Sequence, residues 1–258
     1  MVTIAIQGIL NDISLSNINT YRKFGKVILG VYTTDLDKLT KKYDCKIVKI
    51  PFPPPEGTNH RNIYYQSWSS FHILEKVKTE FVIKVRSDEK FTDLKPIIDK
   101  INKYPNKLIT NNVGFTSTKH VAYHPSDHLI ACNTDILKKT FQHIINICQQ
   151  NKNYNSNEHL MGSLLGINVH YKLMSEQVIF MSYLIAKYGI DGTNQILKMN
   201  MSDLMKQETD VVPFDDLGDI ISSNSRDGER EYRNKEQLQC IYDNGPGCIP
   251  CIRSIEEV

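Results

Sequence analysis

Short apolar segments alternate with helical ones through the first ninety residues, and this alternation restricts the possible folds more than any other feature of the chain. Four segments are short, apolar and rich in β-branched residues, which predicts strands at 3–7, 26–34, 45–50 and 81–85. Apolar residues spaced three and four apart predict a helix over 61–78, and a shorter helix is predicted over 36–43. Strands separated by helices form a sheet with helices on both faces, so we expect an α/β sandwich with a mixed, mostly parallel sheet.

The alternation continues to about residue 200 and then weakens. Further helices are predicted at 93–104, 134–150, 158–165 and from 175 onward, and further strands at 107–111 and 169–173. Beyond residue 200 the chain is acidic, contains glycine and has little periodicity. We therefore expect one main domain over 1–200 and, over 201–258, a C-terminal extension that packs on or covers it.

Composition excludes several classes of protein. The 31 Lys and Arg residues nearly balance the 29 Asp and Glu residues, for a net charge of +2, so nucleic acid is not the expected partner. Six cysteines in 258 residues are too few for a disulfide scaffold, which favours a reducing compartment. The opening residues lack a basic segment and a complete apolar core of a signal peptide, and no run of about 18 apolar residues occurs. The sequence predicts a soluble, cytoplasmic protein without a membrane span.

Polar residues follow three of the predicted strands, at Gln7-Gly8, Thr33 to Asp35 and Arg86 to Asp88. In open α/β sheets ligands bind beyond the carboxyl ends of the strands, so these residues are candidates for a binding site. A carboxylate at Asp88, directly after a buried strand, needs a cationic partner. Mg²⁺, Mn²⁺ or Arg86 would be a suitable partner. The alternative interpretation is that Asp88 caps the following loop.

Two other segments contain residues suited to binding. Arg61 and Asn62 begin a predicted helix, where free backbone amides favour anions, although each residue taken singly is more often a cap or a solvated helix residue. Glu176 lies between a predicted strand and a helix, where it is either part of a helix cap or a general base. The local sequence favours the cap.

The segment around Asp127 and His128 invites a hydrolase or a zinc interpretation, and neither fits. A nucleophile elbow is absent, and members of a catalytic triad normally come from different elements. Pro125 interrupts the helix that would align the histidines at 120, 124 and 128. Asp127 is better interpreted as a polar group that lines a cleft. Cys248 and Cys251 have the spacing of a zinc knuckle, but a turn with incidental thiols is favoured.

Five short motifs, taken in order, resemble those of the WavE-type glycosyltransferases, a family associated with lipopolysaccharide synthesis that has relatives encoded by large DNA viruses. The resemblance covers about residues 3–190, and the ordered set is more specific than any one motif. The motifs are Ile6-Gln7-Gly8, Asn59 to Asn62 with Gln66-Ser67, Ile83 to Asp88, Tyr123 to His128 and Ser175 to Gln177. The resemblance implies a GT-A fold, which is a nucleotide-binding α/β sandwich that uses a nucleotide-diphosphate sugar and a divalent metal.

Carried over residue by residue, the resemblance implies roles for the candidate residues. Arg86-Ser87-Asp88 stands in the place of the Asp-x-Asp motif, with Arg86 replacing the first Asp, so Asp88 is the implied ligand of Mn²⁺ or Mg²⁺. Glu176 is the implied base and Asp127 its rival. The residues implied in binding the nucleoside and the diphosphate are Gln7, Gly8, Thr33, Asp35, Arg61, Asn62, Arg86 and Ser87.

The implied reaction is metal-assisted transfer of a sugar from a nucleotide-diphosphate sugar, expected to be a UDP-sugar, to a hydroxyl of a glycan acceptor in polysaccharide biosynthesis. A nucleotidyltransferase would share the sheet and the metal aspartate but would attack the α-phosphate. A non-catalytic module that binds sugar nucleotides or glycans is the alternative from a different class, because Arg86 makes the metal motif degenerate.

Overall fold

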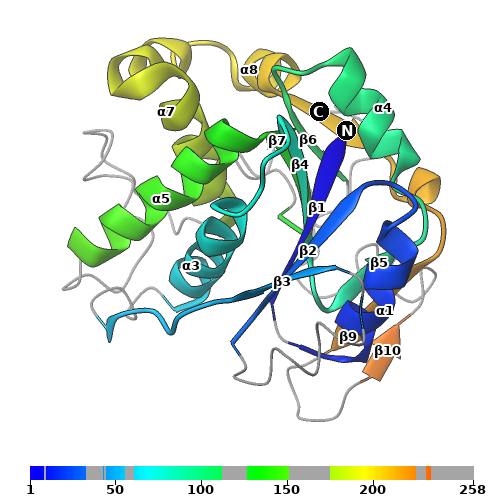
Figure 1. Cartoon of the computed structure of the whole chain (residues 1–258). Helices are drawn as coiled ribbons and strands as arrows, with labels where there is room; N and C mark the ends of the chain where they lie inside the picture. The colour runs from blue at the N-terminus through cyan, green and yellow to red at the C-terminus, as the bar shows by residue number, and fades with distance from the viewer. Residues whose placement is uncertain are drawn as a thin grey trace.

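The computed structural model describes residues 1–8, 10–32, 43, 45–55, 61–111, 127–150, 175–224 and 231–233. Within these residues a seven-stranded sheet forms the centre of the molecule, in the order β3-β2-β1-β4-β7-β6-β8 (Figure 1). Its strands are β1 (Val2–Gln7), β2 (Lys26–Val31), β3 (Lys46–Lys49), β4 (Phe81–Arg86), β6 (Leu108–Asn111), β7 (Leu129–Asn133) and β8 (Thr209–Val212). All run parallel except β7, which is antiparallel to both of its neighbours.

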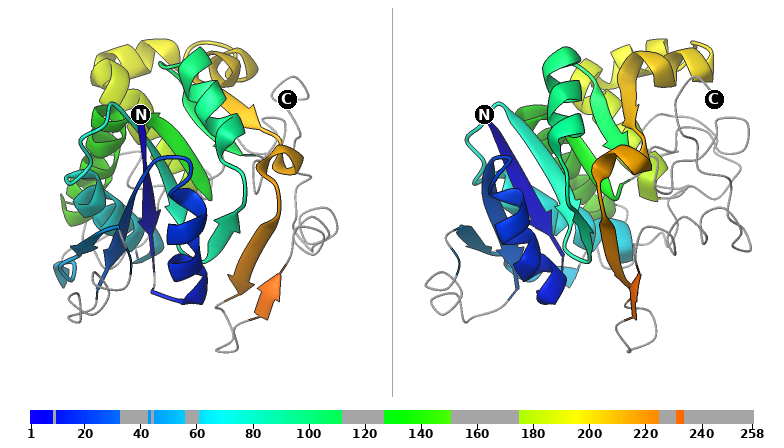
Figure 2. Two further views of the ribbon diagram at one scale, coloured as in Figure 1. Left: turned by 45° about the vertical axis from the view of Figure 1, so that its right-hand side comes forward. Right: turned by 90° about the vertical axis from the view of Figure 1, so that its right-hand side faces the viewer.

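Helices cover both faces of this sheet, as Figures 1 and 2 show. On one face lie α3 (Arg61–Leu74), α5 (Thr134–Gln150) and α7 (Ser175–Ile196), and on the other lie α1 (Asp12–Tyr21) and α4 (Lys95–Lys103). The predicted α/β sandwich with a mixed, mostly parallel sheet is therefore confirmed. Among the described helices, none combines the length and the apolar character needed to cross a membrane.

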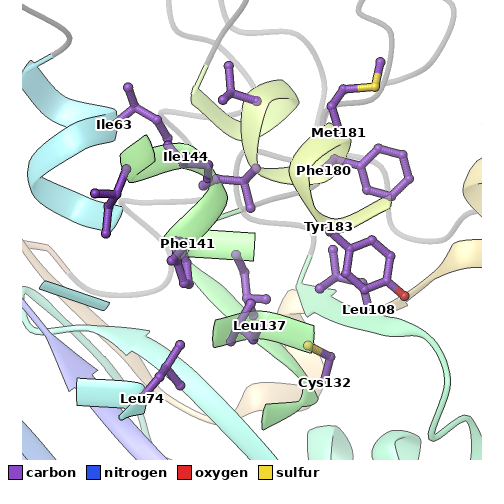
Figure 3. Packing of buried hydrophobic residues seen from close by; sticks show 14 of the residues in the cluster. Ile63, Leu74, Leu108, Cys132, Leu137, Phe141, Ile144, Phe180, Met181 and Tyr183 are labelled. Carbon is purple, nitrogen blue, oxygen red and sulfur yellow. The ribbon is translucent and has the colours of Figure 1, made fainter. Parts of the chain in front are cut away.

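The core lies in two layers because successive residues of a strand point to opposite faces. Val82 packs among residues of α3, α5 and α7, whereas its neighbour Ile83 packs among residues of α1 and α4. Figure 3 shows the first layer, in which Phe141 and Phe180 are fully buried between the helices and the sheet. Two buried layers leave the ends of the strands as the places where polar side chains reach a ligand.

A second, small sheet lies beside the carboxyl end of β4. In the described residues it consists of β5 (Glu89–Phe91), β9 (Ile220–Asn224) and β10 (Glu231–Arg233), all antiparallel. The segment after residue 200, predicted to pack on or cover the main domain, thus supplies β9 to this sheet. It also supplies α8 (Met201–Glu208), β8 at the edge of the central sheet and a 3₁₀ turn, Phe214–Leu217.

Several boundaries differ from those that the sequence predicts. The sequence predicts a short helical or turn segment over 17–24, and α1 begins earlier, at Asp12, because Asn11 caps it and exchanges hydrogen bonds with Ser14. β2 ends at Val31 rather than at residue 34, and α3 ends at Leu74 rather than at residue 78. Strands β5, β7, β8, β9 and β10 were not predicted, because runs of three to five residues carry too little periodicity to be distinguished. The segments predicted at 158–165 and 169–173 lie outside the described residues, and so does 36–43 except for residue 43.

Candidate functional site

The carboxyl ends of β1 and β4 form the point where the sheet changes direction of winding. From β1 the chain proceeds to β2 and β3 on one side, and it then returns to β4 on the other side. Gln7 and Arg86, the last residues of these strands, are direct partners in the register. Ligands of open α/β sheets bind in the crevice at such a switch point, so this edge is the candidate site.

A close backbone approach joins the two strand ends. Gly8 has a φ of +139°, and a Cβ atom built there would lie 2.2 Å from the Oγ atom of Ser87. The amide of Ser87 donates a hydrogen bond of 2.8 Å to the carbonyl oxygen of Gln7. A side chain at position 8 would therefore be strained and would collide with Ser87, which explains the glycine.

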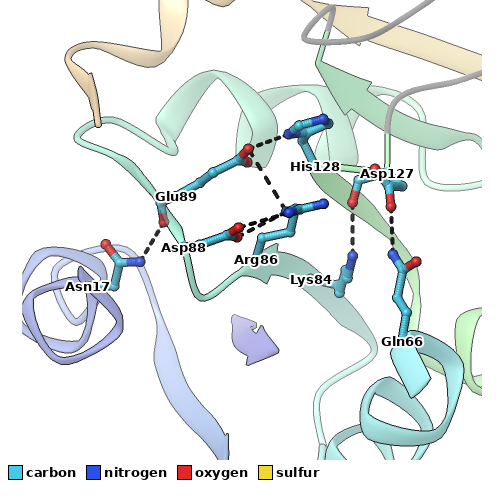
Figure 4. A network of polar contacts seen from close by, with 8 residues as sticks. All are labelled: Asn17, Gln66, Lys84, Arg86, Asp88, Glu89, Asp127 and His128. Carbon is cyan, nitrogen blue, oxygen red and sulfur yellow. Dashed lines mark hydrogen bonds and ion pairs between the residues drawn. The ribbon is translucent and has the colours of Figure 1, made fainter. Parts of the chain in front are cut away.

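The antiparallel strand β7 brings Asp127 and His128, which directly precede it, to the same edge. Asp127 is buried there, and Gln66 of α3 donates to its Oδ2 atom at 2.7 Å. Lys84, which is 1% exposed, donates from Nζ to the carbonyl oxygen of Asp127 at 2.9 Å (Figure 4). A residue far from β4 in sequence is thereby fixed beside its carboxyl end.

Arg86 and Asp88 form a bidentate ion pair. The Nε atom of Arg86 donates to Oδ1 of Asp88 at 3.0 Å and its Nη2 atom donates to Oδ2 at 2.8 Å. The Nδ1 atom of His128 contacts Oε1 of the buried Glu89, and Nε of Arg86 lies 4.0 Å from the same oxygen. Figure 4 shows the contacts of this guanidinium with both Asp88 and Glu89. The two adjacent carboxylates therefore share Arg86, and Glu89 in addition contacts His128.

The ionisable groups at this edge shift one another's pKa values because they lie close together. Burial alone would raise the pKa of Asp127, but the charges of Lys84, His128 and Arg86 outweigh it and hold the pKa of that carboxyl well below its usual range. Burial likewise opposes ionisation of Asp88, yet the hydrogen bonds and charge of Arg86 lower its pKa. Burial would lower the pKa of His128, and the charge of Glu89 together with its hydrogen bond raises it instead. Both aspartates are therefore ionised near neutral pH.

Asp88 is suited to a magnesium-type ion in one respect. Its side chain is 22% exposed and ionised, and a carboxylate has lone pairs beyond the two that Arg86 uses. Mg²⁺ is commonly held by one or two carboxylates together with substrate phosphates. Within the described residues there is no group of three His, Cys, Asp or Glu side chains able to hold a metal by themselves. The residues thus fit an ion that is shared with a diphosphate.

An aromatic pair lies beside the polar cluster, at the end of β2. Tyr32 follows that strand and packs against the α3 face of the sheet, and its ring stacks on Phe52 with centroids 5.6 Å apart. Phe52 is 78% exposed. On the same face Gln7 donates to the Oγ atom of Ser69 at 2.8 Å. The exposed ring of Phe52, held against Tyr32, is a surface on which a planar ligand can stack.

The structure brings together six of the residues predicted for the site, namely Gln7, Gly8, Arg86, Ser87, Asp88 and Asp127. Glu176 lies in the first turn of α7. Seven residues further along this helix, the hydroxyl of Tyr183 donates to the carbonyl oxygen of Asn106, near the amino end of β6. Arg61 and Asn62 begin α3, but their side chains are outside the description. Thr33 and Asp35 lie outside the described residues altogether.

Four further residues of the cluster were not among the predicted site residues, although Gln66 and His128 stand within the WavE-type motifs: Gln66, Lys84, Glu89 and His128. Lys84 carries the one signal that could have revealed it, a lysine within the apolar strand Phe81–Arg86. A charge within a buried strand is costly unless it is paired, so it predicts a partner at the strand end. The other three depend on contacts between elements that no local pattern predicts.

No protein-family model matches the sequence, and no curated protein matches it. Solved structures are similar in part. TarS from S. aureus is 11% identical, with a TM-score of 0.42, over 72% of this chain and 33% of TarS. The glycosyltransferase GlyE from Streptococcus pneumoniae TIGR4 is 13% identical, with a TM-score of 0.39, over 69% of this chain and 41% of GlyE.

A third similarity covers nearly the whole of a smaller enzyme. The 2-C-methyl-D-erythritol 4-phosphate cytidylyltransferase from Thermus thermophilus is 11% identical, with a TM-score of 0.38, over 72% of this chain and 98% of the other. This chain spans well under two thirds of TarS and GlyE. At such identities and TM-scores the similarities carry no argument about activity.

Proposed function

We propose that this protein is a glycosyltransferase of the GT-A type that transfers a sugar from a nucleotide-diphosphate sugar, with UDP as the expected nucleotide, to a hydroxyl of a glycan. The observation that carries the proposal is the cluster at the switch point of β1 and β4, where ionised groups and an exposed ring meet at one edge. The ordered motifs of the WavE-type resemblance supply the kind of reaction.

In this proposal the nucleoside base stacks on Phe52 beside Tyr32, and Gln7 offers its side-chain amide to the nucleoside. The backbone at Gly8 lets the ligand approach the strand ends closely. Arg86, with 37% of its side chain exposed, faces the diphosphate and stabilises the negative charge that develops on the departing nucleotide. The sugar then lies beyond Asp88, towards solvent.

Asp88 would hold Mn²⁺ or Mg²⁺ against the diphosphate. When bound, the ion would supply additional positive charge to the leaving group. Arg86 keeps Asp88 ionised and oriented in either case, because both carboxylate oxygens accept hydrogen bonds from its guanidinium. The cationic side of the site therefore does not depend on the ion alone.

Of the two candidates for the base, Asp127 suits the role less well. It is buried, it accepts a hydrogen bond from Gln66, and nearby cations hold its pKa well below the usual range, so it is a weak proton acceptor. We assign to Asp127 the positioning of Lys84 and Gln66, and to Glu176 the removal of the proton from the acceptor hydroxyl. Glu176→Gln should then lower the transfer rate by about 10²-fold or more with donor affinity kept, and Asp127→Asn should affect stability more than rate.

Analysis of the released nucleotide tests the reaction itself. The protein is incubated with a panel of nucleotide sugars and glycan acceptors, with Mn²⁺ and with EDTA. Free nucleoside diphosphate supports sugar transfer, and pyrophosphate indicates a nucleotidyltransferase. Donor binding without turnover or hydrolysis under any condition indicates a binding module and contradicts the proposal.

The metal assignment has its own test. Asp88→Asn should abolish the part of donor affinity that depends on Mn²⁺, because a neutral amide is a poorer ligand than a carboxylate. Calorimetry of UDP binding with and without Mn²⁺ measures this. Asp99→Asn is the matched control, because Asp99 is a surface residue on α4 that pairs with Lys95. An unchanged metal-dependent affinity in Asp88→Asn would refute the assignment.

A further inference from the structure

The opposite edge of the central sheet contains a cavity of about 470 Å³. Thr3 lies at the amino end of β1, Lys26 begins β2, and Lys46 begins β3. Lys78 and Thr79 approach from the segment that precedes β4. All of these residues line the cavity. A strand rises about 3.3 Å per residue, so the four steps from Thr3 to Gln7 separate this cavity from the candidate active site by about 13 Å.

The cavity is lined by cations. Arg22, Lys26, Lys46, Lys76 and Lys78 all face it, and none of its described lining residues is acidic. In the part of the chain that the structure describes, the side chains of Lys26, Lys76 and Lys78 have neither an ion pair nor a hydrogen bond. Lysines of like charge around one hollow repel each other and concentrate anions there. The hydroxyl of Thr79, which donates to that of Thr3 at 2.8 Å, adds polar groups to the wall.

Helix ends account for part of this charge but not for all of it. Cations are favoured near the carboxyl end of a helix, and the Nζ atom of Lys46 accordingly lies 3.3 Å from the carbonyl oxygen of Lys76, just beyond the end of α3. That effect falls off within the last turn. Lys26 lies on a strand, and Lys78 follows the end of α3 at Leu74 by four residues. These two lysines have no such explanation.

We propose that this cavity is a second binding site, for a small anion with two or more adjacent phosphate groups. Cations from β2, β3 and the segment before β4 converge on one space, which favours a ligand with several negative charges over a single phosphate. The volume falls within the range of about 300–1,000 Å³ that is typical of small-molecule sites. The site does not depend on the proposed glycosyltransferase activity, because it shares no residue with the switch point.

The first test locates binding by NMR. Tripolyphosphate, at constant ionic strength and without divalent metal, should shift the backbone amide signals of Thr3, Gly25 and Thr79. UDP is the comparison ligand. Its two phosphates allow it to enter the cavity as well, but it should in addition shift the amide signals of Gly8 and Ser87. Shifts by tripolyphosphate at Gly8 and Ser87 alone, or no shifts at millimolar concentration, would overturn the second site. Failure of UDP to shift Gly8 and Ser87 would count against the proposed function and leave the second site intact.

The second test uses variants. Lys26→Ala with Lys78→Ala should weaken tripolyphosphate binding by about tenfold or more, because a hydrogen bond to a charged group contributes about 1.5–3 kcal/mol. The charge-preserving pair Lys26→Arg and Lys78→Arg should retain binding. Lys139→Ala with Lys198→Ala is the control, since both residues are exposed lysines outside the cavity.

Calorimetry measures the affinities, and circular dichroism checks the fold of each variant. If the alanine pair proves unstable, Lys46→Gln provides an independent test and should weaken binding in the same direction. Equal losses in the cavity and control variants would mean general attraction to a basic surface and would refute the site. A ten-nucleotide single-stranded DNA that binds more tightly than tripolyphosphate would refute the assignment to a small ligand.

Discussion

The two edges of the central sheet place their charges in opposite ways. At the carboxyl edge Lys84 donates to Asp127, Arg86 pairs with Asp88, and His128 contacts Glu89. At the amino edge Lys26 and Lys78 line a cavity without such partners among the described residues. Burial explains the difference, because a buried charge must be compensated, whereas a charge in contact with solvent need not be. Of the paired charges Arg86 and Asp88 are the most exposed and can also meet a ligand, whereas Lys26 and Lys78 at the amino edge are available without breaking a pair.

The largest expected effect is on the free energy of unfolding and comes from removing the buried cation Lys84. Lys84→Met should lower the free energy of unfolding by about 3 kcal/mol or more, because the buried carboxylate of Asp127 loses the charge that does most to compensate it. Lys46→Met at the amino edge should change it by less than about 0.5 kcal/mol, since that side chain is exposed. Urea unfolding measures both. Equal effects would mean that the two edges do not differ in the way described.

The backbone approach at the switch point should give the next largest effect. Gly8→Ala should destabilise the protein by about 1–3 kcal/mol, because a side chain is strained at that φ and would collide with Ser87. Gly189→Ala is the matched control. It also has a positive φ, of 73°, but a Cβ atom there meets nothing within 4 Å. If thermal unfolding shows the control to be as destabilised as Gly8→Ala, the collision with Ser87 contributes nothing.

A smaller effect is expected at the aromatic pair. Phe52→Ala should leave stability nearly unchanged because the ring is 78% exposed, and it should weaken UDP binding by about tenfold if the base stacks there. The variant Lys26→Ala with Lys78→Ala should retain UDP binding at the switch point, because its lysines lie at the other edge. Calorimetry separates the two. Normal UDP affinity in Phe52→Ala would remove the stacking surface from the proposed site.

The smallest expected effect is a dependence of stability on pH. Glu89 raises the pKa of His128, so the stabilisation due to protonated His128 is complete below its unfolded-state pKa, about 6.5, and is lost as the pH rises through the higher folded-state value. The stability difference between wild type and His128→Gln should therefore shrink with rising pH. Urea unfolding at a series of pH values measures it.

His143 provides a comparison of opposite sign. Burial lowers its pKa, so its contribution is present above the unfolded-state pKa and is lost as the pH falls through that value. The difference between wild type and His143→Gln should shrink with falling pH. The same trend in both variants would show that the contact between His128 and Glu89 does not control the titration.

Local patterns predicted much of the fold but less of the site. The helix over 134–150 was predicted with the bounds that α5 has, because its apolar positions recur at helical spacing. In the structure the side chain of Asn133 accepts hydrogen bonds at its start. The strand ends at Gln7 and Arg86 were predicted as ligand-facing, and the register places them side by side. β7 was missed, since a five-residue apolar run carries too little periodicity to be distinguished.

By itself the sequence determined the alternation of strands and helices, the two apolar faces of the sheet and the polar residues that end β1 and β4. Those features follow from the spacing of residues along the chain, and spacing sets which face a side chain occupies. The tertiary structure decided that Asp127 reaches Lys84, that Asp88 is paired with Arg86, and that lysines from three separate segments surround one cavity. Each of these depends on the order and direction of strands, because only they determine which residues distant in sequence become neighbours.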